Sequence, residues 1–184
     1  MIDVIEITIE EFENNIYCKY INLFPEEEQR EWIDIKKTYQ DGIEKMYKIV
    51  LNDTTIGFFM LEKIKDHPFY LDYFAIYKEY QNKGYGTKAI KKLIDKIGDN
   101  EGIIGEIEKE NNDDINTIKR FEFYKRLGFE KIESEYLFYN VYFTPIVYTK
   151  GKKIDKEKFD KIIFEYYKTN CGENVFKRNF KIIK

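Results

Sequence analysis

One segment of the chain has the residue types of an anion-binding loop: Gln81-Asn82-Lys83-Gly84-Tyr85-Gly86-Thr87. Gly84 and Gly86 lack the Cβ atoms that would keep an anion away from backbone N–H groups. An amphipathic stretch follows, so these N–H groups would lie at the positive end of a helix dipole. We therefore predict that the loop binds a diphosphate mainly through its main chain.

The spacing of the glycines differs from that of two common nucleotide-binding loops. A Walker loop requires Gly-x-x-x-x-Gly-Lys-Ser/Thr, and a dinucleotide site requires Gly-x-Gly-x-x-Gly. The segment from Gln81 to Gly86 matches Gln/Arg-x-x-Gly-x-Gly/Ala instead. A second motif, Tyr-x-x-x-Gly-Phe, runs from Tyr124 to Phe129, and its glycine is placed to end a helix.

In this order the two motifs resemble the GNAT superfamily of acyl-CoA-dependent N-acetyltransferases. The resemblance covers residues 46–148. It implies an α/β (α+β) fold with a mixed, mostly antiparallel central sheet of about six to seven strands flanked by helices. It also implies that acetyl-CoA is the cofactor, that the glycine loop holds the pyrophosphate of coenzyme A, and that Tyr124 lies near the sulfur.

The resemblance implies cofactor-binding residues on a strand, in the loop and on a later helix. They are Phe74, Ala75, Ile76, Tyr77, Gln81, Asn82, Lys83, Gly84, Tyr85, Gly86, Thr87, Lys88, Asn116, Arg120 and Tyr124. Backbone groups of the strand residues would pair with the pantetheine amides as a further strand would. The family's usual asparagine corresponds to Thr117 here, and Asn116 is the neighbouring candidate.

Acetyl transfer from a thioester to an amine needs one group that takes a proton from the amine and another that protonates the departing thiolate. Tyr124 is the expected acid, because a phenol with an ordinary pKa near 10 carries its proton at neutral pH. The expected base is a strand carboxylate, with Glu108 as first choice and Asp72 and Glu106 next.

Each of these residues has a structural alternative. Tyr124 could be a core tyrosine, and the carboxylates could lie on a solvated face or pair with Lys or Arg. Period-two alternation predicts that Tyr70, Asp72 and Phe74 share one face of their strand. The single histidine, His67, precedes a proline and is predicted to be a turn residue.

Strands and helices must position these groups. Apolar patterning and turn residues predict strands over 4–7, 46–51, 55–63, 69–77, 102–108, 131–139 and 141–148. Helices are predicted over 9–22, 25–39, 87–97, 116–127 and 155–167. We expect residues 1–150 to form the acetyltransferase domain and residues 151–184 to form a helical extension packed on the same domain.

Composition limits the function classes. The chain has 184 residues, of which 35% are charged, and its net charge of −3 gives no basic field for nucleic acid. No apolar run approaches the ~20 residues of a membrane span, so we expect a cytoplasmic protein without a membrane partner. The Lys-, Ile- and Asn-rich usage hints at a bacterial source. Cys18 and Cys171 show no metal-ligand spacing, and we expect no metal.

Three functions remain open at this stage. The first is acetylation of a primary amine on a small molecule, by a monomer or homodimer; acidic residues at 111–114 and in the N-terminal helices would attract a cationic acceptor. The second is acetylation of a protein N-terminus or lysine. The third is a non-catalytic acyl-CoA-binding module, against which the presence of Tyr124 argues.

Overall fold

A computed structural model describes residues 1–63, 67–97, 102–149, 154–171 and 173–183 of the chain. The chain divides into two compact units. The first contains Met1–Lys65 and Phe69–Ile97, and the second contains Asp66–Pro68 and Gly98–Lys184. The architecture is mixed α/β with mostly antiparallel strands, as predicted, and the described strands number nine rather than six or seven.

The first unit contains an antiparallel sheet in the order β1-β2-β3-β4. The strands are β1 (Ile2–Ile7), β2 (Glu44–Leu51), β3 (Thr54–Lys63) and β4 (Phe69–Ile76). Asn52 and Asp53, between β2 and β3, have φ values of 46° and 68°. Two consecutive positive φ angles are typical of the tight hairpin turn that asparagine and aspartate favour, and the predicted hairpin is confirmed.

The N-terminal helices are shorter than predicted. The first forms α1 (Ile9–Asn15) and α2 (Tyr17–Leu23), which meet at Ile16, where φ is −124°. The Thr8 side chain caps α1 by accepting from the Glu11 N–H at 3.2 Å, as its residue type favours.

The second predicted helix is also divided. A 3-10 turn, η1 (Glu26–Glu28), is followed by α3 (Trp32–Gln40), and Gln29 and Glu31 between them are extended. The predicted continuous helix from Pro25 was therefore wrong. The extended segment between η1 and α3 carries Arg30.

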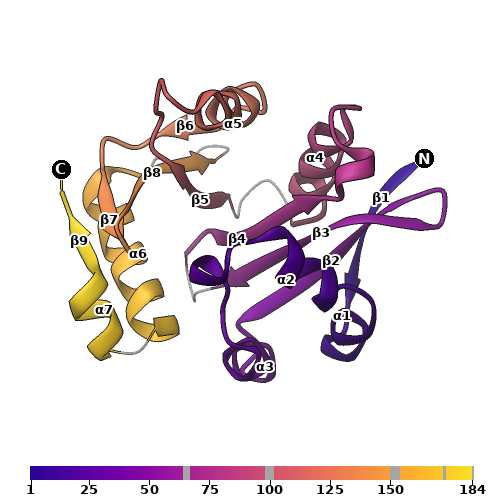
Figure 1. Ribbon diagram of the computed structural model, residues 1–184, viewed down its shortest axis with the longest axis horizontal. Coiled ribbons are helices and arrows are strands. Elements are labelled where there is room, and N and C mark those ends of the chain that lie inside the picture. The colour runs from indigo at the N-terminus through magenta and orange to yellow at the C-terminus, as the bar shows by residue number, and fades with distance from the viewer. Residues whose placement is uncertain (64–66, 98–101, 150–153, 172, 184) are drawn as a thin grey trace. The chain divides into compact units, whose positions relative to one another are not determined.

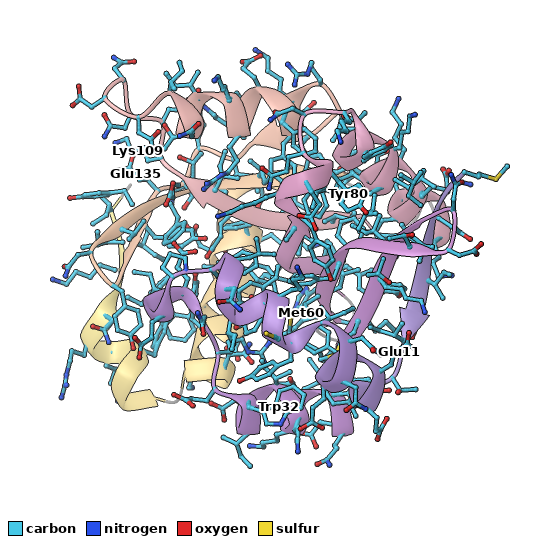
Figure 2. All side chains as sticks on the ribbon, turned by 45° about the vertical axis from the view of Figure 1, so that its right-hand side comes forward. Glu11, Trp32, Met60, Tyr80, Lys109 and Glu135 are labelled. Carbon is cyan, nitrogen blue, oxygen red and sulfur yellow. The ribbon has the colours of Figure 1, made fainter. Side chains whose placement is uncertain are left out.

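The helices α1 to α3 cover one face of the first sheet, and α4 (Tyr85–Ile97) lies on the other side (Figure 1). The covered face holds a core that includes Phe12, Tyr20, Ile35 and Met60, all of them fully buried. Trp32 of α3 packs against this core, and Figure 2 shows both Trp32 and Met60. Burial of these aromatic and aliphatic side chains is the main force that holds the helices on the sheet.

Strand β4 contains a bulge at Asp72. In the β3–β4 register, Met60 lies opposite Tyr73 and Leu61 lies opposite Leu71, so Asp72 is an additional residue. A bulge interrupts the alternation of side chains along its strand. Phe74 therefore stacks on Phe59, on the opposite face from Asp72, and the prediction that Tyr70, Asp72 and Phe74 share a face was wrong.

The second unit has the strand order β5-β8-β7-β9, with β6 also paired to β8. The pairs β5–β8, β7–β8 and β7–β9 are all antiparallel. The elements are β5 (Ile103–Glu108), α5 (Ile115–Lys125), β6 (Glu130–Lys131), β7 (Tyr136–Phe138), β8 (Val141–Tyr148), α6 (Lys156–Cys171), α7 (Glu173–Asn179) and β9 (Phe180–Ile182). The single strand predicted over 131–139 is thus two short strands.

The described part of the C-terminal extension belongs to the second unit. Apolar residues of α6 form a buried stripe at the predicted helical spacing: Phe159, Ile162, Ile163, Tyr166 and Tyr167. The strand β9 pairs with β7, with Phe180 opposite Phe138. Neither α7 nor β9 was predicted. None of the described helices is both long and apolar enough to cross a membrane.

Candidate active site

The predicted phosphate loop leads directly into α4. Asn82 and Gly84 have φ values of 60° and 76°, and the Gly84 carbonyl accepts from the Lys88 N–H at 3.3 Å. A Cβ added at Gly84 would meet no atom within 4 Å, so the space beside its Cα is open. The loop therefore exposes main chain at the beginning of a helix, as an anion site requires.

Side chains of the loop hold its shape. Gln81 Nε2 donates to the Ile76 carbonyl at 2.8 Å, which ties the loop to the end of β4. Lys83 Nζ donates to the Glu79 carbonyl at 2.8 Å. Lys88 Nζ lies 5.9 Å from the centre of the Tyr85 ring. Both lysines place positive charge beside the loop, where it favours a phosphate.

The end of β4 approaches β3 unusually closely. A Cβ on Gly57 would lie 2.2 Å from the Ala75 carbonyl oxygen, which no side chain tolerates. The Tyr77 N–H donates to the Ile56 carbonyl at 2.8 Å. Gly57 therefore fixes the backbone of the predicted pantetheine-binding residues on the β3 side, and sequence reasoning missed it because an isolated strand glycine has no motif.

Asp72 belongs to a buried charge cluster that was also missed. Arg30 Nη1 lies 2.7 Å from Glu44, 2.8 Å from Glu62 and 2.8 Å from Asp72. Arg30 Nη2 donates to Thr38 Oγ1 at 2.8 Å. Carboxylate oxygens of the three acids lie within 4.8 Å of one another, with the guanidinium as the adjacent cation. These contacts hold Arg30 against three strands. They explain why the helix predicted from Pro25 onward is interrupted between η1 and α3.

Three carboxylates surround one guanidinium, so the charges do not balance. Burial, more than the repulsion of Asp72 and Glu62, raises the pKa of Glu44 to about 8. Glu44 Oε1 has no hydrogen-bond partner within the described residues. A protonated Glu44 relieves much of the repulsion inside the cluster.

In the second unit, α5 carries the candidate acid. Tyr124 is 8% exposed, and its ring packs edge-on against Phe129 with centroids 5.2 Å apart. Burial raises the pKa of Tyr124 to about 12, and the nearby Arg120 opposes this shift. The phenol therefore keeps its proton at neutral pH, which is the state required of an acid.

The first turn of α5 is fixed by side chains. Asp114 caps the helix by accepting from the Asn116 N–H at 2.9 Å. Thr117 accepts from the Asn111 N–H and donates to the Asp114 carbonyl, both at 2.8 Å. Thr117 is buried, whereas Asn116 is exposed. Thr117 thus has a structural role at the position to which the resemblance assigns an asparagine, and Asn116 is accessible to solvent.

The two carboxylates of β5 have different partners. Glu108 forms an ion pair with Arg120 at 3.1 Å, and its side chain is 31% exposed. Glu106 accepts a hydrogen bond from the hydroxyl of Tyr167 in α6. The structure thus links α5 to β5 through Glu108, and α6 to β5 through Glu106.

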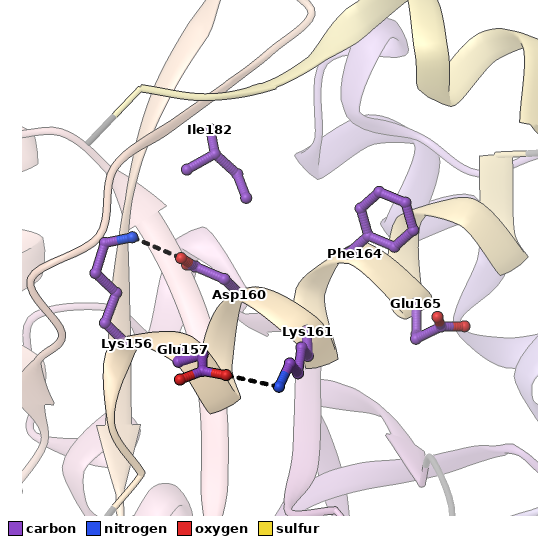
Figure 3. A pocket seen from close by; sticks show the side chains of 7 residues that line it. All are labelled: Lys156, Glu157, Asp160, Lys161, Phe164, Glu165 and Ile182. Carbon is purple, nitrogen blue, oxygen red and sulfur yellow. Dashed lines mark hydrogen bonds and ion pairs between the residues drawn. The ribbon is translucent and has the colours of Figure 1, made fainter.

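A surface hollow of about 530 Å³ lies on the extension (Figure 3). It is lined by Lys156, Glu157, Asp160, Lys161, Phe164, Glu165 and Ile182. Four of these residues form two ion pairs within α6, Lys156–Asp160 at 2.7 Å and Lys161–Glu157 at 2.8 Å. None of the predicted site residues lines this hollow.

Comparison with known proteins gives a family match. The model of the acetyltransferase (GNAT) family matches residues 4–129, which is more than half of the chain. No curated protein sequence matches the chain significantly.

Solved structures share the fold. A protein of Bacteroides thetaiotaomicron assigned as a GNAT-family acetyltransferase is 24% identical, with a TM-score of 0.74 over 90% of this chain and 96% of that one. The Escherichia coli ribosomal-protein-S18-alanine N-acetyltransferase is 16% identical, with a TM-score of 0.59 over 83% and 97% of the two chains.

A third similar structure contains the cofactor. A Bacillus anthracis protein assigned as a streptothricin acetyltransferase, solved with acetyl coenzyme A, is 16% identical, with a TM-score of 0.53 over 82% of this chain and 98% of that one. Together with the family match, these structures confirm the resemblance seen in the two motifs. The chain belongs to the GNAT acetyltransferase family and is an acyltransferase that uses acetyl-CoA.

Proposed function

We propose that the chain is an N-acetyltransferase that acetylates a primary amine of a small, cationic acceptor. The observation that carries the proposal is the open main-chain loop before α4, combined with a buried, protonated tyrosine at the position of the family's acid. An amine is the expected acceptor because the chain presents carboxylates that can take up its proton. The net charge of −3 also favours a cationic acceptor over an anionic one.

Acetyl-CoA fits the loop by the chemistry of the loop itself. Gly84 leaves open space beside exposed main chain, and Lys83 and Lys88 add positive charge. We assign the pyrophosphate to this loop and the pantetheine arm to the backbone of residues 74–77. When bound, acetyl-CoA supplies the acetyl group as a thioester and a thiolate as leaving group.

Tyr124 is the proposed general acid. Its raised pKa keeps the phenolic proton in place throughout the neutral range, so the proton is available to a departing thiolate. Its ring packs edge-on against Phe129, which holds the side chain in place. A Tyr124→Phe variant tests the alternative, in which the tyrosine has only a structural role.

Glu108 is the proposed general base. Its side chain is 31% exposed, so an amine can approach the carboxylate. The Asp72 side chain is only 9% exposed, and Glu106 Oε2 is buried, so these two carboxylates are the second choices. This order agrees with the sequence-based preference for Glu108.

The test begins with cofactor binding and turnover. We expect acetyl-CoA and CoA to raise the melting temperature saturably, and acetyl-CoA to be consumed with one class of amine from a panel of polyamines, aminoglycosides and amino acids. Mass spectrometry of the product would locate the acetyl group on nitrogen. A product acetylated on oxygen would contradict the proposal. So would consumption of acetyl-CoA at a rate that no amine in the panel increases.

Acetylation of a protein is the second candidate function. Its motivation is that the structurally similar E. coli enzyme is named for a ribosomal protein. Peptides with free N-termini and with internal lysines therefore belong in the same panel. Turnover on peptides alone would favour this second function over the first.

A further inference from the structure

The proposed base Glu108 stands at the end of a row of side chains that crosses the second sheet. In the strand register, Glu108 of β5 lies opposite Phe143 of β8, and Phe143 lies opposite Tyr136 of β7. Directly opposed residues of antiparallel strands project from the same face of the sheet, with Cβ atoms about 5 Å apart. On that face, the Phe143 ring is therefore the nearest cross-strand neighbour of the Glu108 carboxylate.

The row becomes more open toward Glu108. Tyr136 is fully buried, Phe143 is partly buried, and the Glu108 side chain is 31% exposed. The Phe143 ring stacks on the Tyr136 ring, with centroids 5.9 Å apart and an angle of 26° between the ring planes. Tyr136 in turn packs against Tyr167 and Phe180. This buried aromatic group fixes the orientation of the Phe143 ring, while part of the ring surface stays open to solvent.

Charge beside the row limits what the open ring surface can bind. The Arg120 guanidinium lies 3.1 Å from Glu108, so one cation already shares this carboxylate. An acceptor with several ammonium groups would bring further positive charge next to Arg120, which would repel it. The ring surface is apolar, and it offers stacking to a flat, apolar body. The site therefore favours a single amine on an apolar, flat skeleton over a polyamine.

We propose that Phe143 is a specificity-determining residue that selects arylalkylamines as acceptors. The aromatic body of the acceptor packs against the Phe143 ring, and its amine lies at Glu108. The spacing fits this class of amine, because a link of two methylene groups spans roughly the 5 Å between neighbouring side chains of the row. The inference rests on the proposed function, in which Glu108 takes up the proton of the amine.

The first test compares three amines as acceptors of the wild type: phenethylamine, n-butylamine and putrescine. We expect kcat/KM for phenethylamine to exceed that for n-butylamine about tenfold, since ring stacking adds to the burial of an apolar body. Putrescine has the carbon chain of n-butylamine with a second ammonium group, and it should be the poorest of the three because Arg120 repels that charge.

The second test removes the ring. Phe143→Ala should raise the KM for phenethylamine about tenfold, with kcat and the KM for acetyl-CoA nearly unchanged. The KM for n-butylamine should rise about threefold or less, since no ring stacking is lost. Phe143→Leu keeps an apolar side chain and should raise the KM for phenethylamine by only about threefold.

The matched control for both variants is Tyr142→Ala. Tyr142 is the preceding aromatic residue of β8 and is 47% exposed, and the alternation of the strand places it on the opposite face from Phe143. Tyr142→Ala should leave the KM values for phenethylamine, n-butylamine and acetyl-CoA unchanged. Melting temperatures of all variants would show that each one is folded at the assay temperature.

The third test reads binding without turnover. Ring carbons of the 15 phenylalanines would be labelled with ¹³C, and Phe143→Leu would identify the Phe143 signals by NMR. In the presence of CoA, we expect phenethylamine to move the Phe143 signals saturably, because a stacked ring changes the local magnetic field. The same concentrations of n-butylamine should move them much less.

The outcomes separate this inference from the proposed function. Equal kcat/KM values for phenethylamine and n-butylamine, or Phe143 signals that phenethylamine does not move, would overturn the role of Phe143 and leave amine acetylation intact. A loss in Phe143→Ala that is the same for every amine would also overturn it, because a merely structural residue acts in this way. If the wild type acetylates no amine, the proposed function fails, and the NMR titration still shows whether an arylalkylamine binds at Phe143.

Discussion

Arg30 Nη1 and Asp72 Oδ2 lie 2.8 Å apart, so the segment before α3 is bound to the bulge of β4. Glu44 and Glu62 bind the same nitrogen from β2 and β3. One guanidinium thus connects three strands of the first unit to the extended residues between η1 and α3. Its removal affects all of them together.

Replacement of Arg30 should be strongly destabilising. Arg30→Met would leave three neighbouring carboxylates without their cation, and we expect a loss of about 3–5 kcal/mol in the free energy of unfolding. The matched control is Arg120→Met, since the Arg120 side chain is 46% exposed and its ion pair with Glu108 should contribute less than about 1 kcal/mol. Equal losses by urea denaturation in both variants would contradict the central role of Arg30.

Glu44 should make stability depend on pH. Its pKa of about 8 in the folded protein exceeds the ordinary value of 4.5, so between these values the folded state holds a proton that the unfolded chain releases. The free energy of unfolding should therefore fall as pH rises from 5 to 8, by up to about 1.4 kcal/mol per pH unit. Glu44→Gln cannot titrate and should lose this slope.

The control for this prediction is Glu157→Gln, at an exposed glutamate whose side chain is 82% accessible. Chemical denaturation of the wild type and both variants at four pH values would give the slopes. A wild-type slope that persists in Glu44→Gln would assign the pH dependence to another group.

Tyr124→Phe tests the general acid. Loss of the hydroxyl should lower kcat by about 10²-fold, with little change in the KM for acetyl-CoA. Because burial raises the pKa of Tyr124 to about 12, its own ionisation should cause no loss of wild-type activity below pH 10. Steady-state kinetics from pH 6 to pH 10 would check both points. A Phe variant with unchanged kcat would return Tyr124 to a structural role.

Gly84 and Gly42 form a matched pair for testing the loop. Both have positive φ, 76° and 72°, and at both an added Cβ would meet no atom within 4 Å. Alanine at either position should cost about 1–2 kcal/mol through backbone strain. Only Gly84→Ala should also raise the KM for acetyl-CoA, by about tenfold, because its methyl group would fill the space proposed for phosphate. An equal effect of Gly42→Ala on KM would argue against the loop assignment.

Phe159 and Phe164 test whether the extension is part of the folded unit. Phe159 is fully buried and Phe164 is 40% exposed on the same helix. Phe159→Ala should cost about 3–5 kcal/mol, and Phe164→Ala should cost less than about 1.5 kcal/mol. A small loss at Phe159 would indicate that α6 is dispensable for folding.

Local sequence signals predicted many elements well. The Thr8 cap, the Asn52-Asp53 turn, the loop before α4 and the stop at Gly128 depend on residues that are close in sequence. Such signals act through backbone conformation and short-range hydrogen bonds, so residue type alone reveals them.

Contacts between distant residues escaped prediction. Arg30 reaches carboxylates 14, 32 and 42 positions away, and no pattern within one helix or strand indicates these pairs. The bulge at Asp72 also shifts the alternation of β4, so a correct strand assignment still gave a wrong face for Phe74. Tertiary packing decides both features.

The pairing of β9 with β7 has a consequence for synthesis. Until residues 180–182 have been made, the outer edge of Tyr136–Phe138 has no partner strand, and such edges promote association between chains. The first unit, in contrast, is complete once residue 97 has been made. Newly made chains should therefore be most prone to aggregate after β7 has been made and before β9 has paired with it, and an insertion directly after Ile182 would interfere with this pairing.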